Sequence, residues 1–176
     1  LLAEAASGSA WTEDFVEQIL HSIREISQRY HLDEAHAECV TENALSLFHV
    51  LQDEHNLGYH HQVLLTVAAR LHAIGLFIWT SRQPKTSKYI IENSDIFGLG
   101  EEDIRLVALI ARYHRRALPR TGHPDYNALT RVQRLVVNKL AAILRVADAL
   151  DRAHTQLLCN PTLRLTDSQL LIEVPA

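Results

Sequence analysis

The sequence has little cysteine and no long apolar run. Its two cysteines, Cys39 and Cys159, lie far apart, and neither belongs to a motif with metal-ligand spacing. We therefore expect two reduced thiols, as in a cytoplasmic protein. No segment approaches the ~20 apolar residues that a membrane-spanning helix needs. The first residues also lack the charged start and apolar run of a secretory signal peptide. These absences predict a cytoplasmic protein that does not contact membranes.

The length and composition of the chain are those of one folded domain. The chain has 176 residues, of which 47% are hydrophobic, as expected for a globular domain with a sizeable core. The net charge of −4 is unevenly spread. Residues 1–54 hold eleven acidic and two basic residues, whereas residues 112–152 hold nine basic and three acidic residues.

The basic segment suggests an anion-binding face. Guanidinium groups match phosphate oxygens well, so these arginines could bind a polyanion, or they could simply cover the solvated sides of two helices. The overall acidity argues against general nucleic-acid binding. The candidates are Arg112, Arg115, Arg116 and Arg120.

Apolar residues recur at helical spacing through most of the chain and predict a mainly α fold of about six or seven helices. Helices are expected after the N-cap residues Thr12 and Asp33, then over residues 62–79, from Pro84, and over 101–116. A long helix is expected over 129–155, and it is expected to be central because it is apolar nearly all round at Leu140–Leu150. After Pro161 the pattern alternates, which predicts a β-hairpin over residues 162–174.

Four polar residues lie on the apolar stripes of four different expected helices. Residues three and four positions apart share a helix face, so packing of these stripes would bring three imidazoles and one carboxylate together. Burial of such groups without partners is costly, which favours a shared site. Asp151 is interpreted as part of an intrahelical charge network, and no role is assigned to His154. The four residues are His36, His72, His114 and Asp148.

The order of these residues resembles the HD superfamily of metal-dependent phosphohydrolases. Segments Arg70–Ile78, Ser87–Leu99, Leu106–Arg116 and Leu140–His154 together resemble the C-terminal HD-like domain of the exopolyphosphatase / guanosine pentaphosphate phosphohydrolase (Ppx/GppA) family. The resemblance implies an HD-like helical bundle that follows an actin-like phosphatase domain. We therefore expect residues 1–176 to be a single domain, excised from a longer chain.

Two positions depart from the metal-binding pattern of that superfamily. The Asp expected after His72 is Ala73, and a His expected just before "YIIENS" is Thr86. Loss of the central carboxylate removes the main anchor for a hard cation. We therefore expect an eroded site, in which His36, His72, His114 and Asp148 could hold one divalent transition metal weakly.

The resemblance implies the function of an accessory domain without catalytic residues of its own. Catalysis would reside in the upstream actin-like domain, which uses magnesium to hydrolyse phosphoric anhydrides of polyphosphate or guanosine pentaphosphate. The present domain would help to form the substrate channel and would contribute to a homodimer. Two alternatives stay open. One is an autonomous metal-dependent HD phosphohydrolase, and the other is a purely structural or dimerisation module whose buried polar cluster only fixes the packing.

Overall fold

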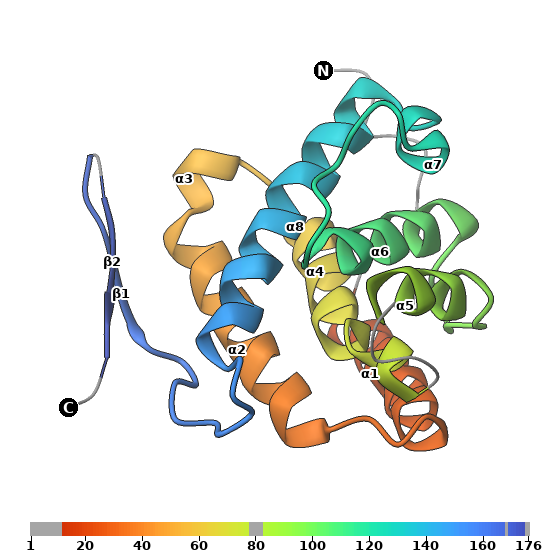
Figure 1. Ribbon diagram of the computed structural model, residues 1–176, viewed down its shortest axis with the longest axis horizontal. Helices are drawn as coiled ribbons and strands as arrows, with labels where there is room; N and C mark the ends of the chain where they lie inside the picture. Colours follow the sequence, from red (N-terminus) through yellow and green to blue (C-terminus); the bar gives the residue numbers. More distant parts are fainter. Residues whose placement is uncertain (1–11, 78–82, 168, 175–176) are drawn as a thin grey trace.

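Helices make up most of the chain that the computed structural model describes, which comprises residues 12–77, 83–167 and 169–174. Short helical turns connect the longer helices; they are α3 (Gln52–His55), the 3-10 turn η1 (Ile74–Phe77) and α7 (Pro124–Asn127). The prediction of a mainly α fold is confirmed (Figure 1). Six helices of the described chain have ten residues or more: α1 (Glu13–Arg29), α2 (Glu34–Val50), α4 (Tyr59–Leu71), α5 (Gln83–Glu92), α6 (Glu101–Tyr113) and α8 (Arg131–Leu150).

Side-chain caps fix the starts of three of these helices. The hydroxyl of Thr12 accepts a hydrogen bond from the N–H of Phe15, and Asp33 accepts one from the N–H of His36. Each cap satisfies a backbone donor that has no partner within the helix. Thr130 and Gln133 form a reciprocal capping box at the start of α8. The expected starts after Thr12 and Asp33 are therefore confirmed.

Three helices end earlier than the apolar pattern indicated, and the one expected over 101–116 ends at Tyr113. The helix expected over 62–79 ends at Leu71, and residues 78–82 lie outside the described chain. Just after this end, the hydroxyl of Ser87 donates to the carbonyl of His72 at 2.7 Å and accepts from the N–H of Gly75 at 2.9 Å, so both backbone groups have a partner outside the helix. The helix expected to reach residue 155 ends at Leu150, where the Asp151 carboxylate accepts the following backbone N–H groups.

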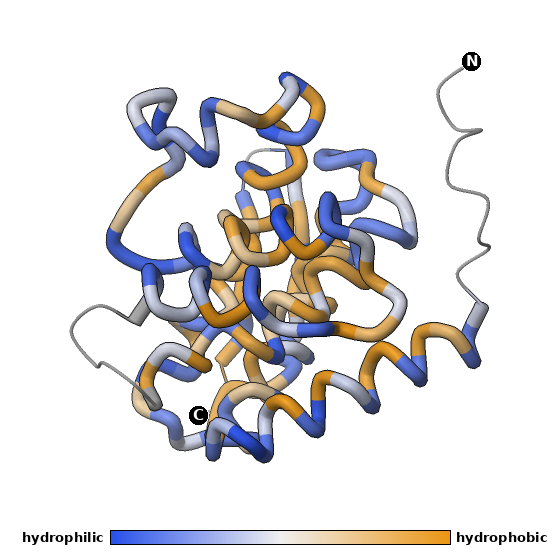
Figure 2. Tube along the Cα trace, turned by 90° about the vertical axis from the view of Figure 1, so that its right-hand side faces the viewer, coloured by the Kyte–Doolittle hydropathy of each residue, from blue (hydrophilic) through white to orange (hydrophobic). Residues whose placement is uncertain are grey.

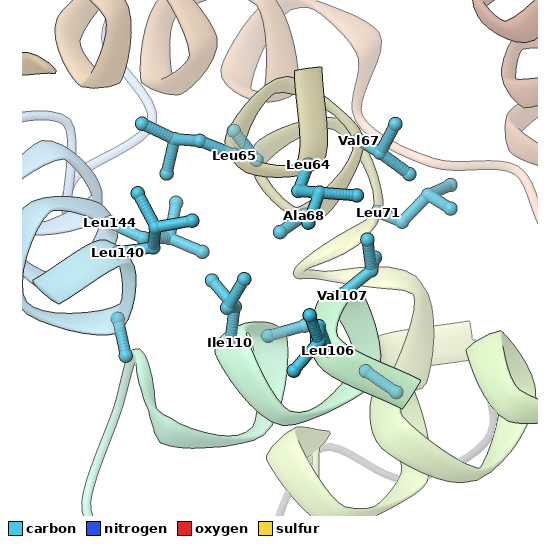
Figure 3. Close-up of a cluster of buried hydrophobic side chains, with 14 of the residues drawn as sticks. Leu64, Leu65, Val67, Ala68, Leu71, Leu106, Val107, Ile110, Leu140 and Leu144 are labelled. Atoms are coloured by element: carbon cyan, nitrogen blue, oxygen red, sulfur yellow. The ribbon is translucent and has the colours of Figure 1, made fainter. Parts of the chain in front are cut away.

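The core lies where α4, α6 and α8 meet. Figure 3 shows Leu64 and Leu65 of α4, Ile110 of α6, and Leu140 and Leu144 of α8 pointing toward one another. All five side chains are fully buried, and each contributes roughly 1.5–3 kcal/mol of burial free energy. Helix α8 packs against α2, α4 and α6, so its predicted central position is confirmed. In the Cα trace, hydrophobic colours gather toward the interior of the bundle, and hydrophilic colours are commoner toward its outside (Figure 2).

A two-stranded antiparallel hairpin follows the helices. Strand β1 (Thr162–Leu165) pairs with β2 (Leu170–Glu173), and Leu163 lies opposite Ile172. The apolar side chains Leu163 and Leu170 pack against the helical core, and β1 contacts α2. The hairpin lies along one side of the bundle (Figure 1). The predicted hairpin is confirmed, and packing on helices supplies the stability that an isolated hairpin lacks.

The prediction of two reduced thiols is wrong. Cys39 of α2 and Cys159 form a disulfide with a Cα–Cα distance of 4.9 Å. Asn43 brings the segment of Cys159 to α2, because its side chain donates to the carbonyl of Leu158 and accepts from the N–H of Asn160, each at 2.8 Å. A sequence separation of 120 residues gave no sign of this pairing.

None of the helices in the described ranges has the length and apolar character needed to cross a membrane.

Candidate functional site

Three of the four residues expected to share a site meet in the interior of the bundle. His36 comes from the first turn of α2, His72 from the end of α4, and Asp148 from the last turn of α8. One ligand atom from each lies within 4.8 Å of the other two. The Nε2 atom of His72 is 3.3 Å from Nε2 of His36 and 3.5 Å from Oδ1 of Asp148. We call these three residues the His–Asp cluster.

The fourth residue, His114, lies beside the His–Asp cluster. It is the C-cap residue of α6. Its ring centroid is 5.0 Å from that of His72, and the two rings are nearly perpendicular. Its Nε2 atom is buried and has no hydrogen-bond partner among the described residues. Since a buried polar atom without a partner is costly, His114 is available to a further group at the edge of the cluster.

All three histidines present the same ring nitrogen to the interior. The Nδ1–H of His36 donates to Oδ2 of Asp151 at 2.8 Å, and that of His72 donates to the carbonyl of Ala69 at 2.7 Å. His114 likewise donates from Nδ1 to the carbonyl of Ala111. A carboxylate and a carbonyl only accept hydrogen bonds, so a neutral ring must carry its proton on Nδ1. Each neutral ring therefore directs an Nε2 lone pair inward, as metal-binding histidines do.

Asp151 has a larger role than the sequence indicated. It is not merely part of an exposed intrahelical charge network, because it is buried and bonded to His36 on another helix. Its other oxygen accepts from the N–H groups of Thr155 and Gln156, at 3.1 and 2.8 Å. No signal in the sequence indicated this role, because the helix was expected to continue to residue 155, whereas Asp151 is the C-cap residue of α8 in the structure.

His154 also has a partner that the sequence did not reveal. Its ring stacks on that of His36, with centroids 3.6 Å apart and an interplanar angle of 15°. Its Nδ1 atom lies 2.9 Å from Oδ2 of Asp33, the residue that caps α2. His154 thus covers the outer face of His36.

Two arginines neutralise the carboxylate of the cluster. Arg115 Nε and an Arg152 guanidinium nitrogen lie 3.4 and 3.2 Å from Oδ2 of Asp148. Both contacts are within ion-pair distance, although that oxygen accepts no hydrogen bond of good geometry from the described residues. Arg115, which the sequence placed on an anion-binding face, is therefore directed to the cluster.

The remaining arginines of that expected face are more dispersed. Arg112 lies against the ring of Tyr113, with its guanidinium carbon 5.4 Å from the ring centroid. Arg116 and Arg120 are exposed. Of the four arginines expected to form an anion-binding face, only Arg116 and Arg120 are therefore exposed.

Burial and charge act in opposite directions on the groups of the site. Burial, helped by the neighbouring His72, lowers the pKa of His114 to about 3. Burial also acts to lower the pKa of His36, but the carboxylates of Asp148 and Asp151 outweigh it and raise that pKa above its ordinary value. The pKa of Asp148 lies well below its usual range, because burial, which acts to raise it, is outweighed by hydrogen bonds to His36 and His72. The site therefore favours a positive charge between Asp148 and Asp151.

The cluster is closed to solvent. His36 and Asp148 are 1% exposed, and His72 and His114 are fully buried. Ala73, which stands where the superfamily pattern has an acid, is also buried. A substrate could therefore reach the cluster only if the surrounding helices or the segment after α8 moved.

Comparison with known proteins places this chain in a family. The family described as "Ppx/GppA phosphatase, domain III" matches residues 20–174. A protein of Photobacterium profundum named guanosine-5'-triphosphate,3'-diphosphate pyrophosphatase is 29% identical over 97% of this chain and 35% of its own length. Proteins of the same name from Aeromonas hydrophila and Aeromonas salmonicida are 33% and 31% identical over 73% and 83% of this chain.

The chain spans only 25 to 35% of the length of these three relatives. The family match, by contrast, covers most of the chain. The chain therefore belongs to the Ppx/GppA phosphatase family, and it corresponds to domain III of that family.

Proposed function

We propose that this chain is a non-catalytic accessory domain of a phosphatase that hydrolyses phosphoric anhydride bonds of guanosine pentaphosphate or polyphosphate. The names of the relatives support the nucleotide substrate. Because the chain spans about a third of their length or less, we assign catalysis to an actin-like domain upstream of it in the parent protein, with magnesium as the cofactor of that domain.

The closure of the His–Asp cluster carries this proposal. A substrate phosphate would have to reach His36, His72 or Asp148, and all three are at most 1% exposed. The buried methyl group of Ala73 supplies no carboxylate beside His72. A site that substrate cannot enter without movement of the fold, and that lacks this acid, is suited to stabilising the fold rather than to turnover.

We further propose that the cluster holds one divalent transition metal of the zinc, nickel or iron type. The donor set fits, since imidazole suits these metals better than magnesium. Without a cation, the inward Nε2 atoms of His36 and His72 face each other at 3.3 Å, and two lone pairs at that distance repel unless one ring is protonated. His36, His72 and Asp148 would hold the ion, with His114 adjacent. A bound ion would join α2, α4 and α8 and so add to folding stability.

Arg116 and Arg120 support the proposal that this domain lies near the substrate channel of the parent protein. Both are exposed, and guanidinium groups bind phosphate oxygens in a fork geometry. We assign them, with Arg112, to a surface that guides the polyanion toward the upstream domain. Homodimerisation of the parent protein is part of the same proposal and would be checked by its mass in solution.

An autonomous HD phosphohydrolase is the second candidate. It is favoured by the cluster itself and by the two guanidinium groups that lie 3.2 and 3.4 Å from Asp148, since such groups could bind a phosphate. It requires the closed site to open, which the burial of the four residues opposes.

A hydrolysis assay separates the two functions. The purified chain would be incubated with polyphosphate or guanosine pentaphosphate, and with magnesium, manganese, nickel or zinc in turn, while released phosphate is measured. We expect no turnover above a control lacking protein. Robust turnover that disappears in His72→Ala but persists in His61→Ala, which lies outside the cluster, would overturn the accessory role and establish the autonomous hydrolase.

A further inference from the structure

The segment between α8 and the hairpin covers the His–Asp cluster. It runs from residue 151 to 161, and we call it the cover segment. Asp151 at its start bonds to Nδ1 of His36 at 2.8 Å, and His154 stacks on the His36 ring at 3.6 Å. Any route to His36 from this side of the bundle therefore requires the cover segment to move.

The disulfide ties the far end of the cover segment to the helix that carries His36. Cys39 lies one helical turn after His36 on α2, and Cys159 lies in the cover segment. Asn43, one further turn along α2, bonds to Leu158 and Asn160, and Ser46 donates to the side chain of Asn160 at 2.7 Å. The covalent bond and this group of hydrogen bonds thus hold one end of the segment in place.

Other features of the cover segment favour its release. His154, Gln156 and Asn160 have positive φ angles of 54°, 53° and 53°, a conformation that costs free energy for residues other than glycine. Leu157 is 76% exposed and contributes little packing. The Asp33–His154 and Ser46–Asn160 contacts are solvent-exposed, where a hydrogen bond adds little to stability. The disulfide is therefore the strongest single restraint on this segment.

We infer that Cys39 and Cys159 form a redox-sensitive latch: the disulfide keeps the cover segment closed over the His–Asp cluster, and its reduction opens metal access to that cluster. The metal part of this inference rests on the proposed cation site. The movement of the cover segment does not, and it can be tested separately.

Reduction of the Cys39–Cys159 disulfide requires a thiol reductant, and a dithiol can supply both of the thiol groups that the reaction consumes. Cys159 is partly exposed whereas Cys39 is 2% exposed, so a thiolate of the reductant attacks Sγ of Cys159. The S–S bond breaks, Cys39 leaves as a thiolate that takes up a proton, and a mixed disulfide forms. The second thiolate of the reductant then displaces Cys159, which is protonated in turn. Two electrons pass to the protein, and the dithiol is oxidised to a disulfide.

Hydrogen exchange tests the latch without any metal. Amide exchange in residues 152–160 would be compared between the oxidised protein, the protein reduced with dithiothreitol, and Cys39→Ser/Cys159→Ser. Reduction and the double substitution should each accelerate exchange there by about tenfold, because local opening becomes easier once the restraint is removed. Amides of α6 serve as the internal reference. Equal exchange in the oxidised and reduced proteins would overturn the latch, as would the absence of the disulfide from the oxidised protein by mass spectrometry.

Cobalt(II) tests the consequence for the metal. The cobalt-loaded oxidised protein and the cobalt-loaded Cys39→Ser/Cys159→Ser variant would be mixed with excess EDTA, and loss of the visible absorption of cobalt would be followed. The serine variant has no thiolate that could itself bind cobalt. We expect release about tenfold faster from the variant, as for the opening of the cover segment. Equal release rates would overturn the role of the latch in metal access.

The two experiments together distinguish failure of the proposed metal site from failure of the latch. If cobalt binds neither form while exchange in residues 152–160 still rises on reduction, the proposed metal site fails and the latch on the cover segment stands. If the serine variant does not fold, the reduced wild-type protein supplies the exchange comparison.

Discussion

Nδ1 of His36 lies 2.8 Å from Oδ2 of Asp151, and 115 residues of sequence separate the two. This bond directs the opposite nitrogen of His36 toward His72 and Asp148. Asp151 is therefore a positioning residue: it sets which nitrogen of His36 can bind a cation, although it does not face the cluster interior itself.

Replacement of Asp151 should weaken metal binding. In Asp151→Asn the amide oxygen can still accept from His36, but the negative charge that raises the basicity of the ring is lost. Outer partners of metal-bound histidines are typically worth about 10–100-fold in affinity, and we expect a loss in that range for zinc, measured by chelator competition. Asp33→Asn is the matched control, because Asn also caps helices well and Asp33 contacts the backbone of His36 and the ring of His154. An affinity unchanged in Asp151→Asn would contradict the positioning role.

Restoration of the missing acid should strengthen the cation site. Ala73→Asp places a carboxylate beside His72 at a buried position, so without metal the variant should be less stable than wild type. With zinc it should show a larger thermal shift and a higher metal content than wild type. Adding Thr86→His should raise the metal content further.

Ala73→Asn separates charge from size in this experiment. It introduces a side chain of similar shape without the negative charge, and it should gain no affinity. If wild type already holds one full equivalent of tightly bound metal, the site is not eroded. If Ala73→Asp gains none, the residue after His72 does not reach the ion.

The contribution of His114 to the folding stability of the metal-free protein should fall in mild acid, whereas His36, whose pKa is raised, acts in the opposite direction. The folded-state pKa of the His114 ring is about 3, against 6.5 for an unperturbed histidine. Below pH 6.5 the unfolded chain therefore takes up a proton that the folded protein does not. This group thus contributes full stability above pH 6.5 and loses it as the pH falls toward 3, by up to about 1.4 kcal/mol per pH unit.

The measurement for His114 is urea unfolding in EDTA at pH 7 and at about pH 5, where this linkage acts. His114→Asn keeps a donor for the carbonyl of Ala111 but does not titrate, so its stability should fall less between the two pH values. A pH dependence equal to that of wild type would show that burial does not hold His114 neutral.

Polyphosphate binding should depend on the exposed arginines and on salt. The triple variant Arg112→Gln/Arg116→Gln/Arg120→Gln should bind polyphosphate more weakly, and wild-type binding should weaken as salt screens charges beyond about 8–10 Å. Arg29→Gln, which removes an exposed arginine of α1, is the control and should bind as wild type does. Binding insensitive to both salt and the triple substitution would remove the anion-binding surface from the proposal.

Arg115→Gln should behave differently from the other arginine substitutions. Arg115 lies 3.4 Å from the buried carboxylate of Asp148, so its loss leaves that charge with Arg152 as its remaining guanidinium neighbour among the described residues. We expect lower folding stability, measured by urea unfolding, rather than only weaker polyphosphate binding. A stability equal to wild type would show that Arg152 alone suffices.

The sequence by itself determined the helices and the hairpin, because these depend on neighbours in the chain. Apolar residues at helical spacing, and caps such as Thr12 and Asp33, are local signals. The placement of His36, His72 and Asp148 on apolar stripes was also visible, since a residue on a buried face must be buried whatever its polarity.

Only the tertiary structure decided which residues meet across the chain. The Cys39–Cys159 disulfide, the His36–Asp151 bond and the stacking of His154 on His36 all depend on the path of residues 151–161 back across α2. The same holds for Arg115, which lies in the basic segment but is drawn to Asp148. Loop paths follow from the sum of many weak contacts rather than from a periodic pattern, so the partners of these residues appear only when the helices have packed.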